Sequence, residues 1–205
     1  MTYKQLRDRV RFILNDMEAR TYPEEMIKTL INEALRIFCR ETLILEGSSS
    51  SLSYSSPGFT LPTDLIKVKV VQWVNSNGEE FRVSAEDLSV VLERQAQGVT
   101  LAVVATPKNY AIDNGKMILD STTQTSPEVY YYKYDSALSA DGDTPAMDSE
   151  YHRALVDYAV YELVKGNPQM IGLANTSYNA WLHSQDLADR TKRKAGNVKV
   201  RPRFL

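Results

Sequence analysis

Helical periodicity occupies both ends of this sequence, whereas the middle alternates apolar and polar residues as strands do. Apolar side chains recur every three or four positions over residues 2–17 and 23–45, and again over 149–165 and 168–190. Between these stretches, short alternating runs are separated by Asn-Gly pairs, which favour tight hairpin turns. The order predicts an α+β protein: a helical bundle built from the N- and C-terminal helices, with an inserted antiparallel β domain and an extended C-terminal arm.

Local signals place the ends of the expected helices. Thr2 and Gln5 have capping-box spacing, and Pro23 suits the first residue of a second helix. Asn167-Pro168 offers the same kind of start to the last helix. In the middle, Ser84 with Asp87 is expected to cap a short helix that Gly98 ends, and residues 99–105 are then expected to form a buried strand.

These signals divide the chain into three parts. Residues 1–47 and 148–191 form the predicted helical bundle, residues 48–147 the inserted antiparallel β domain, and residues 192–205 the extended basic arm. The serine-rich stretch 48–58 has two readings that the sequence leaves open. It is a flexible linker, or the alternation of Leu52 and Tyr54 makes it an edge strand.

Charge is unevenly distributed along the chain. The net charge is −2, but six basic residues and no acidic ones lie in the last fourteen positions. Without them, 18 basic residues face 26 acidic ones, so the body carries −8 and the arm +6. Within the arm, apolar residues alternate with basic ones, a pattern that can add to a sheet edge or lie in an acidic groove of a partner. A solvated, disordered tail is the alternative. The candidate binding residues are Lys192, Arg193, Lys194, Val198, Lys199, Val200, Arg201, Arg203 and Phe204.

Composition excludes several classes of protein. Cys39 is the single cysteine, so an intrachain disulfide and a cysteine-based zinc site are excluded. The first residues lack the apolar core of a signal peptide, and no apolar run approaches the roughly 18 residues of a membrane span, which predicts a protein made and kept in the cytosol.

Catalytic motifs are absent from the sequence. His152 and His183 are the only histidines, no phosphate-binding glycine motif occurs, and no cofactor or metal is expected. The acidic stretch Asp141–Asp143 lacks the frame of a calcium loop and is better explained as a turn before a helix. The tyrosines of 130–134 could stack on bases or sugars, but strand residues with one face on the core explain them better. The protein is predicted not to be an enzyme.

Several motifs, taken in order, resemble the head-to-tail adaptor proteins of tailed bacteriophages, including the tail accessory factors of short-tailed phages. The resemblance covers most of the chain. The matching segments are Ile31-Asn32-Glu33-Ala34, Phe59-Thr60-Leu61-Pro62-Thr63-Asp64-Leu65, Tyr110-Ala111-Ile112, Tyr131-Tyr132-Lys133-Tyr134, the loop from Asp141 to Pro145, and Tyr151-His152-Arg153-Ala154-Leu155-Val156-Asp157-Tyr158-Ala159. The chain departs from the family at Asp120-Ser121-Thr122, where a proline often follows the hairpin.

This resemblance implies a structural virion protein of the neck, assembled in the bacterial host cytoplasm. Such adaptors form a ring, usually twelvefold, on the portal protein, extend the channel used for DNA ejection, and offer a docking platform to the tail or nozzle protein. The implied partners are the portal, neighbouring adaptor subunits, a tail protein, and genomic DNA that passes without specific binding. The arm, opposite in charge to the body, suits a ring in which one surface meets a different one.

Two other functions stay open. A nucleic-acid-binding protein could grip phosphate with its basic arm. A hydrolase of cell-wall degradation is the other possibility, because adaptors occasionally carry such an activity, although no acid/base pair in the sequence supports it.

Overall fold

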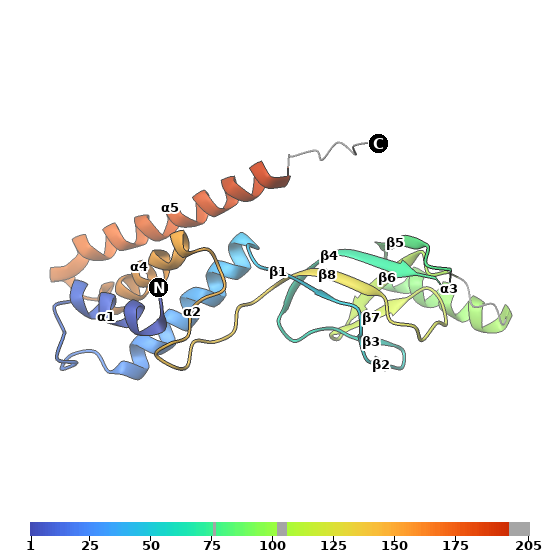
Figure 1. Cartoon of the computed structure of the whole chain (residues 1–205), viewed down its shortest axis with the longest axis horizontal. Helices are drawn as coiled ribbons and strands as arrows, with labels where there is room; N and C mark the ends of the chain where they lie inside the picture. The colour runs from blue at the N-terminus through green and yellow to red at the C-terminus, as the bar shows by residue number, and fades with distance from the viewer. Residues whose placement is uncertain (76, 102–105, 197–205) are drawn as a thin grey trace. The chain divides into compact units, whose positions relative to one another are not determined.

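The computed structural model describes residues 1–75, 77–101 and 106–196, and the chain folds into two compact units. Met1–Leu45 and the chain from Tyr134 onward form the helical unit, and Glu46–Lys133 form the β unit, which is inserted into it (Figure 1). The fold class is therefore α+β, as the sequence predicts. The segment from Tyr134 to Met147, assigned above to the β domain, belongs instead to the helical unit.

Up to Gly196, the helical unit consists of four α-helices and two short 3-10 helices. In chain order they are α1 (Tyr3–Ile13), α2 (Glu24–Thr42), η1 (Ser149–Tyr151), α4 (His152–Val164), η2 (Pro168–Met170) and α5 (Ile171–Gly196). Helices α1, α2 and α5 each contact α4, whose residues are buried on nearly every side. Three aromatic rings meet where α2, α4 and α5 come together: the Trp181 ring lies 5.4 Å from that of Phe38 and 5.0 Å from that of Tyr158.

Two of the predicted helix starts, at Thr2 and at Asn167, form as expected. The Thr2 hydroxyl accepts from Gln5 N, and the Gln5 side chain accepts from Thr2 N, which completes the capping box. Pro23 precedes the first residue of α2 instead of being that residue. Asn167 Oδ1 accepts from Gln169 N ahead of Pro168. These are short-range bonds, so the local sequence is sufficient to predict them.

The loop between the units is tied to the helices by side chains. Asn32 on α2 accepts from Leu138 N at 2.7 Å and donates to Leu138 O at 3.0 Å. Leu138 is itself buried. Asp143 Oδ2 accepts from Ser139 N and Ala140 N, so the acidic stretch forms a turn closed by its own carboxylate. These contacts explain why the segment belongs to the helical unit although it has no regular structure.

In its described residues, the β unit contains one sheet of eight strands and one helix. Its elements are β1 (Glu46–Ser49), β2 (Tyr54–Ser55), β3 (Gly58–Thr60), β4 (Leu65–Val74), β5 (Glu80–Ala85), α3 (Leu88–Leu101), β6 (Asn109–Asp113), β7 (Lys116–Leu119) and β8 (Glu128–Lys133). The strand order is β1-β8-β4-β5-β6-β7-β3-β2. The serine-rich stretch thus supplies both edge strands, β1 and β2, with the buried Leu52 between them.

The sheet is mostly antiparallel, and one parallel pair departs from the expected antiparallel domain. Strands β5 and β6 pair in parallel, with Ser84 opposite Asn109, because α3 crosses between them. Helix α3 runs to Leu101, so Gly98 does not end it and residues 99–101 are not part of a strand. The rest of the expected strand, residues 102–105, lies outside the described residues. Asp87 accepts from Ser89 N at the start of α3, whereas Ser84 lies in β5.

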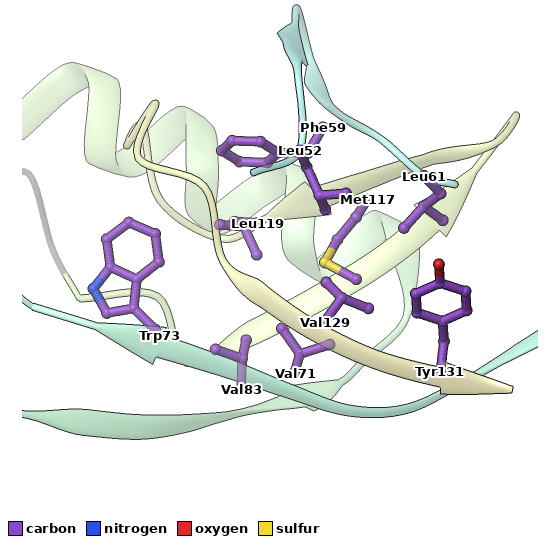
Figure 2. Close-up of a cluster of buried hydrophobic side chains, with 10 residues drawn as sticks. All are labelled: Leu52, Phe59, Leu61, Val71, Trp73, Val83, Met117, Leu119, Val129 and Tyr131. Atoms are coloured by element: carbon purple, nitrogen blue, oxygen red, sulfur yellow. The ribbon is translucent and has the colours of Figure 1, made fainter. Parts of the chain in front are cut away.

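The core of the β unit lies inside the curl of this sheet. Figure 2 shows side chains from one half of the sheet, among them Val71, Val83 and Val129, pointing toward Phe59 and Met117 from the other half. The remaining members of the cluster are Leu52, Leu61, Trp73, Leu119 and Tyr131. Burial of these groups is the main stabilising contribution to this unit.

Candidate functional site

The C-terminal end of α5 carries the first of the predicted binding residues. Lys192 and Arg193 lie in this helix, which continues to Gly196 and so corrects the expectation of an extended arm from residue 192. Lysine, arginine and alanine favour helices, and positive side chains are stabilised near a helix C-terminus. The last turns of α5 can therefore form without an amphipathic pattern. The side chain of Lys192 is half-buried, and its Nζ donates to Thr42 O at the end of α2, at 3.4 Å.

The other predicted residues are not placed beside them. Lys194 is in α5, and its side chain is not described. The remainder of the predicted set lies outside the described residues: Val198, Lys199, Val200, Arg201, Arg203 and Phe204. Among the predicted binding residues whose side chains are described, Lys192 lies against the C-terminal end of α2, and Arg193 is exposed next to it in α5.

A groove that the sequence did not reveal lies at the opposite end of α2. It has a volume of about 720 Å³, and the first turns of α2 and the end of α4 line it. Met26, Leu30 and Leu163 give it an apolar surface, while Glu25 and Glu162 supply carboxylates. The sequence puts Met26 and Leu30 in the apolar stripe of α2, but Met26 is 51% exposed whereas Ile27 and Ile31 are fully buried.

One wall of the groove, Thr21–Pro23, is held by the buried carboxylate of Asp16. Its oxygens accept from the backbone N–H groups of Arg20, Thr21 and Tyr22 at 3.0–3.1 Å, and Arg11 Nη1 lies 3.4 Å away. Burial alone would raise the pKa of Asp16, but these hydrogen bonds, with Tyr22 first, hold the pKa below its ordinary value. The turn is thus fixed by an ionised carboxylate.

Three titratable side chains of the helical unit, those of His152, Cys39 and Asp157, are buried. His152 is buried, with Nε2 2.9 Å from Met147 O and Nδ1 2.5 Å from the Met1 amino group. Burial raises the pKa of the Cys39 thiol to about 11. It also raises the pKa of Asp157, against the opposing effect of Arg153. Within residues 1–75, 77–101 and 106–196, no three His, Cys, Asp or Glu side chains come together as a metal site would require.

The tyrosines of the last strand point in different directions. Tyr131 is buried in the core, and its hydroxyl donates to Asp64 Oδ1 at 3.2 Å. Tyr130 is exposed and donates to Glu128, whereas Tyr134 belongs to the helical unit, where the Arg36 guanidinium lies 4.7 Å from its ring. Alternation along a strand accounts for the first two positions, and the four rings do not form one stacking platform.

Comparison with known protein families identifies the family of this chain. A family model described as SU10 adaptor protein, a family of phage head-to-tail adaptors, matches residues 1–203. No curated protein matches the chain. In the part of the chain that the structure describes, no helix is both long and apolar enough to cross a bilayer.

Proposed function

The chain belongs to the SU10 adaptor protein family of phage head-to-tail adaptors, and from this membership we propose that it forms a ring on the portal. The ring, twelvefold as is usual in such adaptors, would extend the DNA channel and give the tail or nozzle protein a docking platform. Genomic DNA would pass through it without specific binding. The family supports a structural role and a place in the virion. The observation that carries the proposal is the match over residues 1–203.

We propose the basic C-terminal segment as the portal-binding part. Lys192, Arg193 and Lys194 would start this surface at the end of α5, and Val198, Lys199, Val200, Arg201, Arg203 and Phe204 would continue it. Its charge of +6 complements acidic protein, and its apolar residues can fill pockets between the ion pairs. Buried in this way, the segment would not hold the DNA that passes through the channel.

The proposal is tested by sedimentation of the purified protein with portal rings. We expect the full chain to sediment with the rings and a chain ending at Gly196 to stay in solution with an unchanged melting temperature. Images of the sedimented complex should show a ring seated on the portal. Equal sedimentation of the truncated chain would contradict the assignment of the arm, and no sedimentation of the full chain would contradict the function.

A nucleic-acid-binding protein is the second candidate, favoured by the same cluster of positive charge. It predicts that free DNA is retained by the full chain, with an affinity that falls steeply as salt rises. The adaptor function predicts negligible retention of free DNA. Measuring DNA retention and portal sedimentation on the same preparation therefore separates the two.

A further inference from the structure

The groove at the start of α2 is an apolar surface with an acidic rim. Met26 is half-exposed within it, and Leu30 and Leu163 are only partly covered. Glu25 on α2 is exposed and has no ion pair among the described side chains, while Glu162 on α4 pairs with Lys165 at 2.5 Å. A surface of this composition fits an apolar side chain accompanied by a cation.

This groove faces away from α1. Glu24, in the first turn of α2, accepts from Arg7 of α1 at 2.5 Å, so that side of α2 is turned toward α1. Met26 follows two residues later, roughly 200° around the helix. Met26 therefore lies on the side of α2 that is turned away from the Arg7–Glu24 pair.

The outer face of α1 carries the complementary chemistry. Phe12 is 64% exposed, on the side of α1 opposite the buried Leu6 and Val10. The Arg9 guanidinium lies 5.4 Å from the Phe12 ring, which holds a cation beside the exposed aromatic group. Helix α1 contains four basic residues and one acidic residue. Exposed aromatic and arginine side chains are the types that most often dominate the energy of protein interfaces.

We propose that the groove receives Phe12 of a second copy of this chain, with Arg9 of that copy facing Glu25 and Glu162. The phenyl ring of Phe12 would replace solvent over Met26, Leu30 and Leu163. The Arg9 guanidinium would lie near the carboxylates of Glu25 and Glu162. Because the two surfaces differ, the contact is heterologous and can repeat from copy to copy. The inference rests on the proposed ring, for which it names the contact between subunits.

The test is cross-linking between introduced cysteines. The variant with both Asp8→Cys, one turn before Phe12 on α1, and Thr29→Cys, at the edge of the groove, keeps Phe12 and Met26 and is treated with a short bis-maleimide, alone and bound to portal rings. Cys39 is buried, with its pKa raised to about 11, so it stays unlabelled in the folded protein. We expect a ladder of covalent multimers. Mixing the two single variants should stop the ladder at dimers, because each copy then carries only one of the two positions.

Further variants test whether cross-linking depends on the groove and on the charges of Arg9 and Glu25. Ile112 in the β unit is 47% exposed, so Asp8→Cys with Ile112→Cys offers an accessible pair of cysteines outside the groove and should give no ladder. Arg9→Glu in the double-cysteine background should slow cross-linking several-fold, and adding Glu25→Arg should restore the rate.

Portal sedimentation of the same variant separates this inference from the proposed function. A variant that sediments with portal rings but gives no ladder overturns the contact and leaves the function standing. A ladder without portal binding supports the contact and counts against the function. Failure of both measurements, with an unchanged melting curve, contradicts both.

Discussion

Asp16 shows how a single carboxylate can fix the geometry of a turn between two helices. It is buried and faces three backbone N–H groups and the Arg11 guanidinium. No regular structure between α1 and α2 supplies those N–H groups with partners. Unpaired buried N–H groups are costly, so the carboxylate substitutes for the missing backbone acceptors.

Replacing Asp16 by Asn is expected to lower the melting temperature at neutral pH by several degrees, because the amide offers one acceptor oxygen where the carboxylate offers two. The folded pKa lies below the ordinary value, so the stabilisation is fully present above the unfolded pKa of about 3.9 and is lost as pH falls through the folded pKa. The difference between wild type and Asp16→Asn should therefore shrink below pH 4. Melting curves from pH 7 to pH 2 measure it. Asp186→Asn, which removes an exposed ion pair with Arg190, is the control and should change little.

At the level of helices and strands, the sequence predicts those turns and helix ends that depend on residues close together in the chain. Asn77-Gly78 and Asn114-Gly115 turn where expected, since Gly78, Asn114 and Gly115 have positive φ. The path of α3 could not be predicted in this way: a glycine within a helix costs only about 1 kcal/mol, so Gly98 does not have to end it. The crossover it forms then makes β5 and β6 parallel.

Contacts far apart in sequence set the remaining features. The bonds between Asn32 and Leu138 join residues 106 positions apart, and the local pattern around Leu138 gives no sign of them. The sequence pattern does not reveal the groove at the start of α2, for a similar reason. Whether Met26 and Leu30 are covered depends on how far α4 and α5 extend over α2, and their helical spacing is the same in either case.

Gly58 tests the packing of strand β3 against its neighbour β7 in the β unit. A Cβ at this position would lie 2.4 Å from Met117 O on β7, so strand β3 can approach β7 only without a side chain there. Gly58→Ala is expected to destabilise the β unit by about 1–3 kcal/mol. Chemical unfolding followed by Trp73 fluorescence measures the loss. Gly142→Ala is the matched control, because a Cβ at Gly142 meets nothing within 4 Å. Equal effects of the two substitutions would contradict the packing argument.

At the scale of the whole chain, we expect the helical unit to fold without the inserted β unit. The chain enters that unit at β1 and leaves it at β8, and these strands pair side by side, with Glu46 opposite Tyr132. Paired residues on antiparallel strands have Cα atoms only about 5 Å apart. Replacing residues 46–133 by a short Gly-Ser linker should therefore leave a helical unit that unfolds cooperatively. Circular dichroism and amide chemical-shift dispersion measure this. Helical content without a cooperative transition would show that the helical core depends on the insert.

The final prediction separates portal binding from DNA binding by charge reversal at Arg201 and Arg203. A protein that lines a DNA channel must let a polyanion pass, and basic side chains repeated around a ring would hold phosphate strongly. The proposed adaptor therefore has its arm buried against acidic protein, where paired charges act chiefly on specificity and dissociation. Arg201→Glu with Arg203→Glu should weaken sedimentation with portal rings at least tenfold and leave free-DNA affinity negligible.

Arg82→Glu with Lys108→Glu is the control for this charge reversal. It changes the net charge by the same amount on the β unit, where neither side chain has an ion pair among the described residues. This control should sediment with the portal like wild type, because general repulsion is too weak at physiological salt to release a specific contact. If the arm variant instead keeps portal binding and loses a measurable, salt-dependent DNA affinity, the arm is a phosphate clamp. Nucleic-acid binding would then be its function.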